Sequence, residues 1–167
     1  LLTVAAQFSV NSTFKKYSQI RSQRGLTGRD AAEAVLRNAG IFNVTIEHVS
    51  GNLTDHYDPR TNVIRLSDSV YHSTSIAAAG VAAHEAGHAV QYAEGYSPIK
   101  IRNAIIPVTN IGSQLAWPLI IVGLLFSALR SLAFAGVILF ATVVLFQLIT
   151  LPVEFNASRR AILALES

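Results

Sequence analysis

Neither cysteine nor methionine occurs in the 167-residue sequence. The absence of cysteine excludes disulfide bonds, thiolate nucleophiles and cysteine-ligated zinc or iron–sulfur sites, so histidine and carboxylate side chains must hold any bound metal. Because methionine is absent, the sequence has no initiator residue, and we expect it to be a segment of a longer protein. Residues 1–10 are apolar and follow no cationic segment, so we interpret them as the end of an upstream membrane helix and not as a signal peptide.

Charged residues are also scarce. They make up 14% of the chain, against about a quarter in typical soluble domains, while 51% of the residues are hydrophobic and the mean hydropathy is +0.40. The net charge of +3 is not accompanied by a basic patch interleaved with aromatic residues or by a glycine-rich phosphate loop, so nucleic acid is not an expected partner. We therefore predict an integral membrane protein and expect the lipid bilayer to be one of its partners.

Two long apolar stretches, residues 105–129 and 132–151, support this interpretation. Each has about the 20 residues that a spanning helix requires, and Arg130 with Ser131 separates them. We predict a transmembrane helical hairpin over residues 105–151, with a pair of buried soluble helices as the alternative. By the positive-inside rule, the cations flanking the hairpin place its two ends in the cytoplasm. These cations are Lys100, Arg102, Arg159 and Arg160, against Arg130 alone at the turn.

Residues 11–104 are expected to form the cytoplasmic part of the protein. Thr27 can cap a helix over residues 28–38, which Gly40 would end. Three β-like runs follow at residues 44–49, 53–57 and 63–66, and the turn residues at 58–62 predict a hairpin between the last two. We interpret the third run as an edge strand that could pair with a peptide substrate, although a purely structural sheet fits the pattern equally well. This run consists of Val63, Ile64, Arg65 and Leu66.

The chemistry is concentrated in the sequence His84-Glu85-Ala86-Gly87-His88. On a helix, His84 and His88 lie one turn apart on the same face and can bind one Zn²⁺, while Glu85 beside them can take a proton from water. The helix is expected to begin near residues 73–75 and to end at Gly95. The alternative is a buried helix whose two histidines only satisfy hydrogen bonds.

A catalytic zinc usually has three protein ligands, and the third must be found elsewhere in the chain. Downstream of His88 the sequence offers three carboxylates, Glu94, Glu154 and Glu166, and no histidine. Glu94 should point away from the metal face unless the helix breaks at Gln91. Glu154 follows the apolar hairpin, which returns the chain to the side of the zinc helix. We therefore predict Glu154 as the third ligand, with Glu94 as its rival.

Several segments together resemble the bacterial membrane-bound neutral zinc metallopeptidases. They are residues 53–59, the His84–His88 sequence, the two apolar stretches and residues 152–158, and the likeness covers nearly the whole chain. The resemblance implies a gluzincin-type HExxH site with Glu154 as third ligand, and further sequence on both sides of this segment. Residues 154–157 are also similar to the prenyl-protein and heat-shock membrane metalloproteases. Ser158 departs from their pattern, which has an acidic residue there.

The predicted fold is an α+β integral membrane protein, with a zincin-like HExxH helix, a small β-sheet and a transmembrane hairpin. We divide the chain into the end of a membrane helix (1–10), a cytoplasmic catalytic part (11–104), the hairpin (105–151) and a ligand-bearing helix (152–167). The predicted function is that of a membrane-anchored endopeptidase with one Zn²⁺, acting on unfolded or membrane-associated polypeptides at the cytoplasmic face. The alternative is a zinc-stabilised scaffold or adaptor without turnover.

Other residues are weaker candidates for this site. Side chains that could stabilise the transition state or orient the metal ligands are His56, Tyr57, Tyr71, His72 and Arg159. We interpret His48 as structural.

Overall fold

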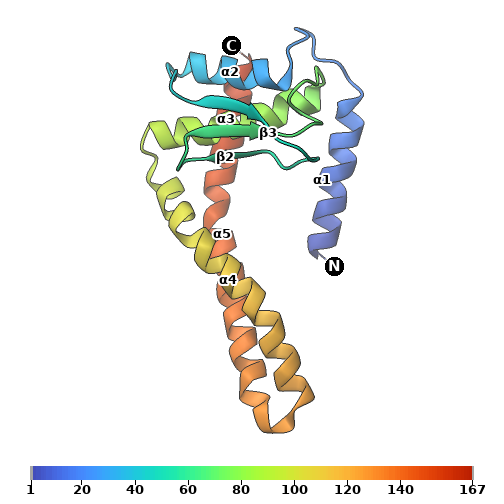
Figure 1. The fold of residues 1–167 in the computed structure, drawn as a ribbon, viewed down its shortest axis with the longest axis vertical. Coiled ribbons are helices and arrows are strands. Elements are labelled where there is room, and N and C mark those ends of the chain that lie inside the picture. The colour runs from blue at the N-terminus through green and yellow to red at the C-terminus, as the bar shows by residue number, and fades with distance from the viewer. Residues whose placement is uncertain (1, 167) are drawn as a thin grey trace. The chain divides into compact units, whose positions relative to one another are not determined.

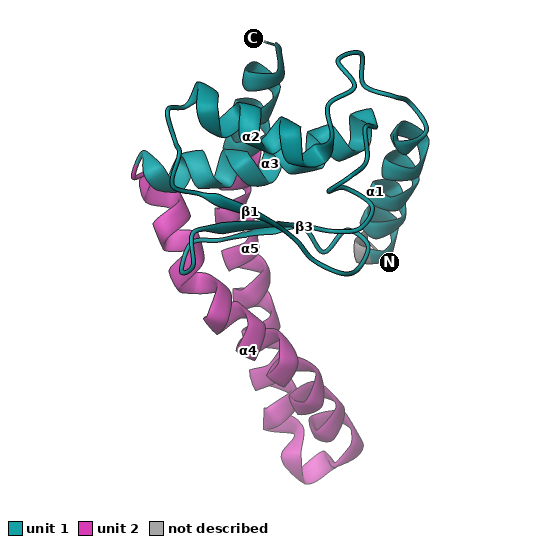
Figure 2. Cartoon of the chain, turned by 45° about the horizontal axis from the view of Figure 1, so that its top comes forward, with its two compact units in different colours: residues 1–94, 156–167 teal, residues 95–155 magenta. Residues whose placement is uncertain are grey.

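The computed structural model describes residues 2–166 and is mostly helical, with one small three-stranded sheet (Figure 1). Residues 1 and 167, the outer ends of the predicted first and last segments, lie outside the described residues. The chain divides into two compact units (Figure 2). One unit contains residues 1–94 and 156–167, and the other contains residues 95–155. The predicted small sheet is present, but helices contribute most of the fold.

Two helices begin the first unit, α1 (Leu2–Ser18) and α2 (Gly28–Asn38). The predicted cap of α2 is confirmed. The Thr27 hydroxyl accepts a hydrogen bond from the backbone N–H of Asp30, and the Asp30 carboxylate accepts one from the backbone N–H of Thr27. This reciprocal capping box satisfies two N–H groups that the first turn of a helix would otherwise leave unpaired.

The sheet contains β1 (Thr45–His48), β2 (His56–Asp58) and β3 (Val63–Leu66) in the order β1-β3-β2. The predicted hairpin is confirmed, because β2 and β3 pair antiparallel, whereas β1 runs parallel to β3. The edge-strand assignment is wrong: Val63, Ile64, Arg65 and Leu66 form the central strand, with neighbours on both sides. Three of these four residues are buried, and two of them, Ile64 and Leu66, belong to the hydrophobic core. The edges of the sheet are β1 and β2.

Helix α3 (Ile76–Ala93) carries the His84–His88 sequence and lies within the predicted limits. The Ser75 side chain caps its first turn by accepting from the backbone N–H of Ala78, and Gly95 follows its end with φ +69°. Helices α2 and α3 pack on each other, and α3 also contacts β2 and β3. The core that they share includes the buried side chains of Val35, Leu36, Ile64, Leu66, Val70, Ala82, Ala86, Val90 and Ala161.

The second unit is a helical hairpin made by α4 (Ser97–Leu125), the short 3₁₀ helix η1 (Ser127–Leu129) and most of α5 (Arg130–Glu166). The turn lies just before Arg130, the first residue of α5, rather than at Arg130 and Ser131 as predicted. The two helices approach closely where their residues are small: a Cβ atom on Gly123 would lie 2.3 Å from the backbone nitrogen of Ala133.

Both long helices have the length and composition to cross a membrane. In the most apolar 18 residues of each helix, only 17% is buried within the protein. The core helix of a soluble domain would instead be mostly buried. Helix α5 also continues through Pro152 to Glu166, so no break separates the predicted hairpin from the predicted ligand-bearing segment. The last turns of α5 belong to the first unit.

Candidate metal centre

His84 and His88 lie one turn apart on α3, with their ring centroids 4.7 Å apart and the ring planes at 80° to each other. His88 is buried, while His84 and the adjacent Glu85 are half-buried. The surrounding α3 residues are mostly alanine and glycine, which leaves room for other elements to approach the helix. This arrangement presents two imidazoles and one carboxylate on neighbouring positions of a packed helix.

In each of the two rings, Nδ1 contacts a polar side chain. His84 Nδ1 lies 3.0 Å from the Ser158 hydroxyl on α5, and His88 Nδ1 lies 3.0 Å from the Gln91 side-chain oxygen. A metal-binding histidine typically uses one ring nitrogen for the ion and donates from the other to a polar group. In both histidines this pattern would leave Nε2 to bind a metal. At His84 this polar group is the Ser158 hydroxyl.

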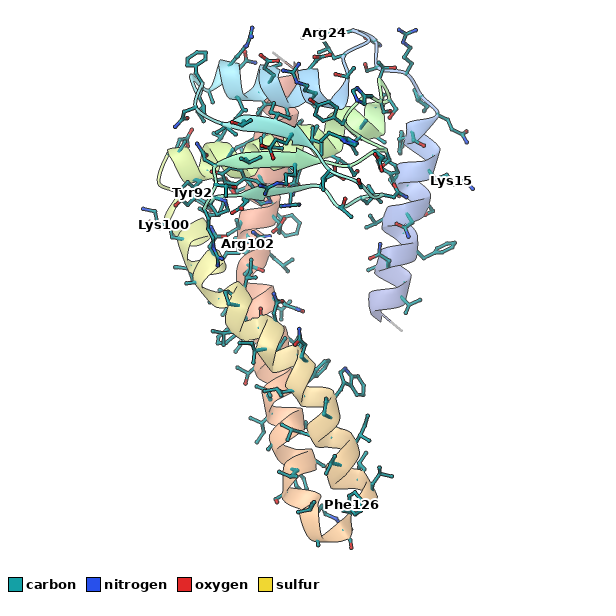
Figure 3. The ribbon with its side chains drawn as sticks, viewed as in Figure 1. Lys15, Arg24, Tyr92, Lys100, Arg102 and Phe126 are labelled. Atoms are coloured by element: carbon teal, nitrogen blue, oxygen red, sulfur yellow. The ribbon has the colours of Figure 1, made fainter. Side chains whose placement is uncertain are left out.

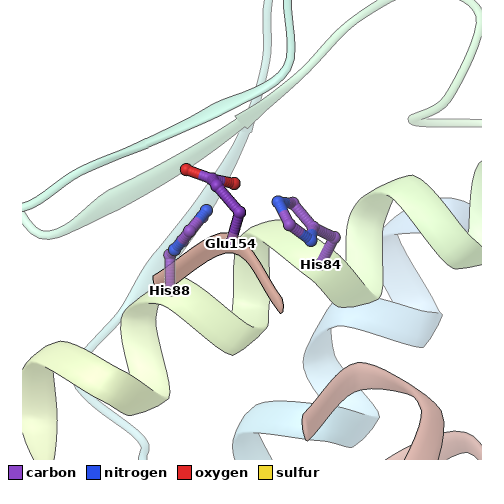
Figure 4. A group of neighbouring side chains, drawn as sticks. All are labelled: His84, His88 and Glu154. Carbon is purple, nitrogen blue, oxygen red and sulfur yellow. The ribbon is translucent and has the colours of Figure 1, made fainter. Parts of the chain in front are cut away.

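Glu154 on α5 completes the group (Figure 4). The ligand atoms of His84, His88 and Glu154 all lie within 4.8 Å of one another. Two imidazole nitrogens and one carboxylate oxygen form a donor set typical of catalytic zinc, which keeps its remaining coordination position for water. The donor chemistry and the hydrogen bonds at both Nδ1 atoms thus fit a zinc ion.

Glu154 also forms an ion pair within the helical hairpin. Its Oε1 atom lies 2.8 Å from Nη2 of Arg102. Arg102 lies on α4 (Figure 3). From the sequence, Arg102 is only one of the cations that indicate membrane topology. The ion pair gives it a second role, since a guanidinium beside the carboxylate holds one oxygen and restricts the orientation of the other.

Glu94, the rival ligand, lies elsewhere. It is the C-terminal cap residue of α3, and its carboxylate accepts a hydrogen bond of 2.7 Å from Nη1 of Arg160. The helix does not break at Gln91, so Glu94 does not return to the face of His84 and His88. It is not a member of the metal-ligand group that the described residues form.

Tyr57 and His56, both proposed as auxiliary residues, lie on β2. The Tyr57 hydroxyl donates to the Asn62 side chain at 2.8 Å, and its ring stacks edge-on against Tyr92. Burial, with smaller contributions from Tyr92 and Asp58, raises the pKa of Tyr57 to about 12, so it remains a neutral hydroxyl. His56 is exposed, with Nδ1 2.9 Å from the carbonyl oxygen of Thr54. The hydrogen bonds of both side chains are thus local to β2 and its flanking turns, while the Tyr57 ring also contacts α3.

Tyr71 and His72 form a cluster of rings with His48. The His48 Nε2 atom lies 2.6 Å from the Asp68 carboxylate, and the pKa of Asp68 is lowered by hydrogen bonds from the Gly51 backbone N–H and from His48. The cluster supports the interpretation of His48 as structural. The remaining auxiliary candidate, Arg159, is exposed on α5.

Four further residues support the centre, and their contacts there were not predicted from the sequence: Gly87, Gln91, Asn156 and Arg160. A Cβ atom on Gly87 would lie 2.6 Å from the carbonyl oxygen of Ala157, so glycine permits the contact between α3 and α5. The other three form a chain of hydrogen bonds that ends at His88. Gly87 and Asn156 had a signal in the sequence, because each lies within a segment that resembles known proteases.

Comparison with known proteins agrees with this chemistry. The model of a family described as "Putative neutral zinc metallopeptidase" matches residues 1–167. A curated protein of Bacillus subtilis (strain 168), named "Putative membrane protease YugP", is 48% identical over 160 residues, which are 96% of this chain and 71% of that protein. No solved structure matches the chain. The description of the matched family is that of a putative zinc metallopeptidase, and the relative carries the name of a putative membrane protease.

Proposed function

Because the chain belongs to this family of neutral zinc metallopeptidases, we propose that it is a membrane-anchored zinc endopeptidase with Glu85 as general base. The family implies zinc and a peptide substrate, and the relative together with the two apolar helices indicates membrane association. The observation that carries the proposal is the convergence of His84, His88 and Glu154 within 4.8 Å. These three side chains would be the protein ligands of a single Zn²⁺.

Each ligand has a partner that restricts its orientation. Ser158 contacts His84 and Gln91 contacts His88, while Arg102 holds the Glu154 carboxylate. Such fixed ligands lose little conformational entropy when they bind an ion, which favours tight binding in one geometry. When bound, Zn²⁺ would lower the pKa of water and polarise a peptide carbonyl group.

Glu85 is the residue that we assign to proton transfer. It directly follows His84 on α3, and its half-buried carboxylate belongs to the same helix as two of the ligands. In peptide hydrolysis the oxygen of water bonds to the carbonyl carbon while the C–N bond breaks. Glu85 would take the proton that water loses and pass it to the nitrogen of the leaving amine.

The hairpin of α4 and α5 suggests where the substrate is met. We propose that the two helices span the membrane, with Lys100 and Arg102 at one end and Arg130 at the other, and that the cation-rich end faces the cytoplasm. Glu154 lies at the same end of the hairpin as Arg102, because the two form an ion pair. A protease with this topology would act on unfolded or membrane-associated polypeptides close to the cytoplasmic surface.

The test combines metal analysis with proteolysis of a casein-type substrate by the purified protein in detergent. We expect about one zinc per chain and cleavage that a chelator abolishes. Glu85→Gln should retain zinc but lose cleavage, because the amide has the same size and cannot accept the proton. Undiminished cleavage by this variant would reject Glu85 as the base, and a zinc-loaded wild-type protein without turnover on any unfolded substrate would favour a scaffold.

A further inference from the structure

We propose that Gln91, Asn156 and Arg160 are positioning residues that select the tautomer of His88 and so prepare its Nε2 atom for a metal. The proposal rests on the metal site proposed above and adds a set of residues to it. The three side chains connect α3 with the last turns of α5, and all of them belong to the first compact unit.

The observed contacts form a continuous path. His88 Nδ1 lies 3.0 Å from Gln91 Oε1, and Gln91 Nε2 donates to Asn156 Oδ1 at 2.9 Å. The same Asn156 oxygen accepts a second hydrogen bond, of 2.7 Å, from Nε of Arg160. At the outer end of the path, Arg160 Nη1 donates to the Glu94 carboxylate at 2.7 Å.

The direction of every bond in this path follows from the arginine. A guanidinium has only donors, so the Asn156 atom that faces Arg160 must be the amide oxygen. That oxygen can only accept, and Gln91 must therefore approach it with its NH₂ group. The Gln91 oxygen is then turned toward His88, and an acceptor at this position requires a hydrogen on Nδ1. His88 is thereby held as the tautomer whose Nε2 carries a lone pair.

Burial makes this selection strict. Gln91 has no exposed surface and His88 is 5% exposed, so a reversed Gln91 amide would place its oxygen against the Asn156 oxygen, two acceptors facing each other away from water. The opposite tautomer of His88 would point an N–H bond at the site of the ion instead of a lone pair. Arg160, partly exposed and paired with Glu94, thus controls a buried ring from the protein surface.

The decisive pair of variants is Asn156→Asp and Asn156→Leu. An aspartate can accept from both Gln91 and Arg160 and cannot reverse, so zinc affinity should stay within about threefold of wild type. A leucine of similar size cannot accept a hydrogen bond. It should lower zinc affinity by about 10- to 100-fold, the usual effect of losing a group that orients a metal ligand. Affinity is measured by competition with a chromogenic chelator in the full chain, and folding is checked by circular dichroism and thermal unfolding.

Nitrogen-15 NMR of histidine-labelled, zinc-free protein reports the tautomer directly. At a pH where all five imidazoles are neutral, wild type and Asn156→Asp should show His88 protonated on Nδ1, whereas Asn156→Leu should show a mixture. If Asn156→Leu fails to fold, Arg160→Met tests the same path from its partly exposed end and should also give mixed tautomers. Thr142→Val, which removes a side-chain hydrogen bond on α5 three turns before the site, is the control and should change neither reading.

Equal zinc affinity and an unchanged Nδ1–H signal in folded Asn156→Leu or Arg160→Met would overturn the proposal. So would an equal loss in Asn156→Asp and Asn156→Leu, because only the leucine removes the acceptor. Neither reading depends on proteolysis, so failure of the proposed peptidase activity would leave this test intact and would be recognised separately.

Discussion

Gly87 on α3 lies directly against the backbone of Ala157 on α5, so closely that a Cβ atom on Gly87 would be 2.6 Å from the Ala157 carbonyl oxygen. The same stretch of α5 carries Asn156 and Ser158, which contact Gln91 and His84 on α3. Gly87, the fourth residue of the His84–His88 sequence, therefore sets the distance between the helix that bears the histidines and the helix that bears their partners.

Gly87→Ala should consequently destabilise the protein and weaken zinc binding. The added methyl group must push the two backbones apart, and overpacking of this kind costs about 1–3 kcal/mol, more than the better helix propensity of alanine returns. Gly80→Ala on the same helix is the matched control, because a Cβ atom at Gly80 meets nothing within 4 Å. It should be neutral or slightly stabilising. Thermal unfolding and chelator competition measure both effects, and equal behaviour of the two variants would refute the close-contact argument.

Replacing the two rival carboxylates tests the identity of the third ligand. Glu154→Ala should lose zinc as well as proteolysis, because it removes one of the three donors within 4.8 Å. Glu94→Ala should retain much of both, since Glu94 caps α3 and pairs with Arg160. Metal analysis of the two purified variants gives the answer, and the reverse pattern would assign the ligand to Glu94.

The membrane topology predicts that the start of α4 and the turn after it are accessible from opposite sides of the membrane. Ser97 begins α4 and Ser131 is the second residue of the return helix α5, so single cysteines at these positions should react with an impermeant thiol reagent from opposite sides of the membrane. The wild-type chain contains no cysteine and gives no background. Labelling of both positions from one side would mean that the hairpin does not span.

The capping box of α2 predicts a pH-dependent contribution to stability. Hydrogen bonds from the Thr27 side chain and backbone lower the pKa of Asp30 below its ordinary value of 3.8. A carboxylate with a lowered native pKa stabilises the fold above its unfolded pKa, and this contribution is lost as the pH falls through the native value. Asp30→Asn should therefore cost about 0.5–1 kcal/mol at neutral pH and nothing at strongly acidic pH.

The free energy of unfolding of wild type and Asp30→Asn, measured from neutral to strongly acidic pH, would check the expectation. Glu33→Gln on the same helix is the control, because its exposed pair with Arg37 should be worth at most a few tenths of a kcal/mol. A stability difference for Asp30→Asn that does not change with pH would contradict the assigned origin.

The sequence by itself determined the elements whose causes are local. Thr27 predicted the start of α2, and Gly95 predicted the end of α3, because caps depend on residues within one turn of the helix end. Two long apolar stretches predicted the paired long helices, and the spacing of His84 and His88 placed both rings on one face. Each inference uses only neighbours along the chain.

The tertiary structure alone decided which distant residues meet. Strand order depends on backbone pairing between separate segments. The apolar residues of β3 fit an edge strand and a central strand equally well, and only the pairing with β1 and β2 makes β3 central. Likewise, Ser158 reaches His84 across 74 positions of sequence, and Gln91 reaches Asn156 across 65. Such contacts arise from the packing of α3 against α5 at Gly87, and no periodicity or spacing within a single element specifies them.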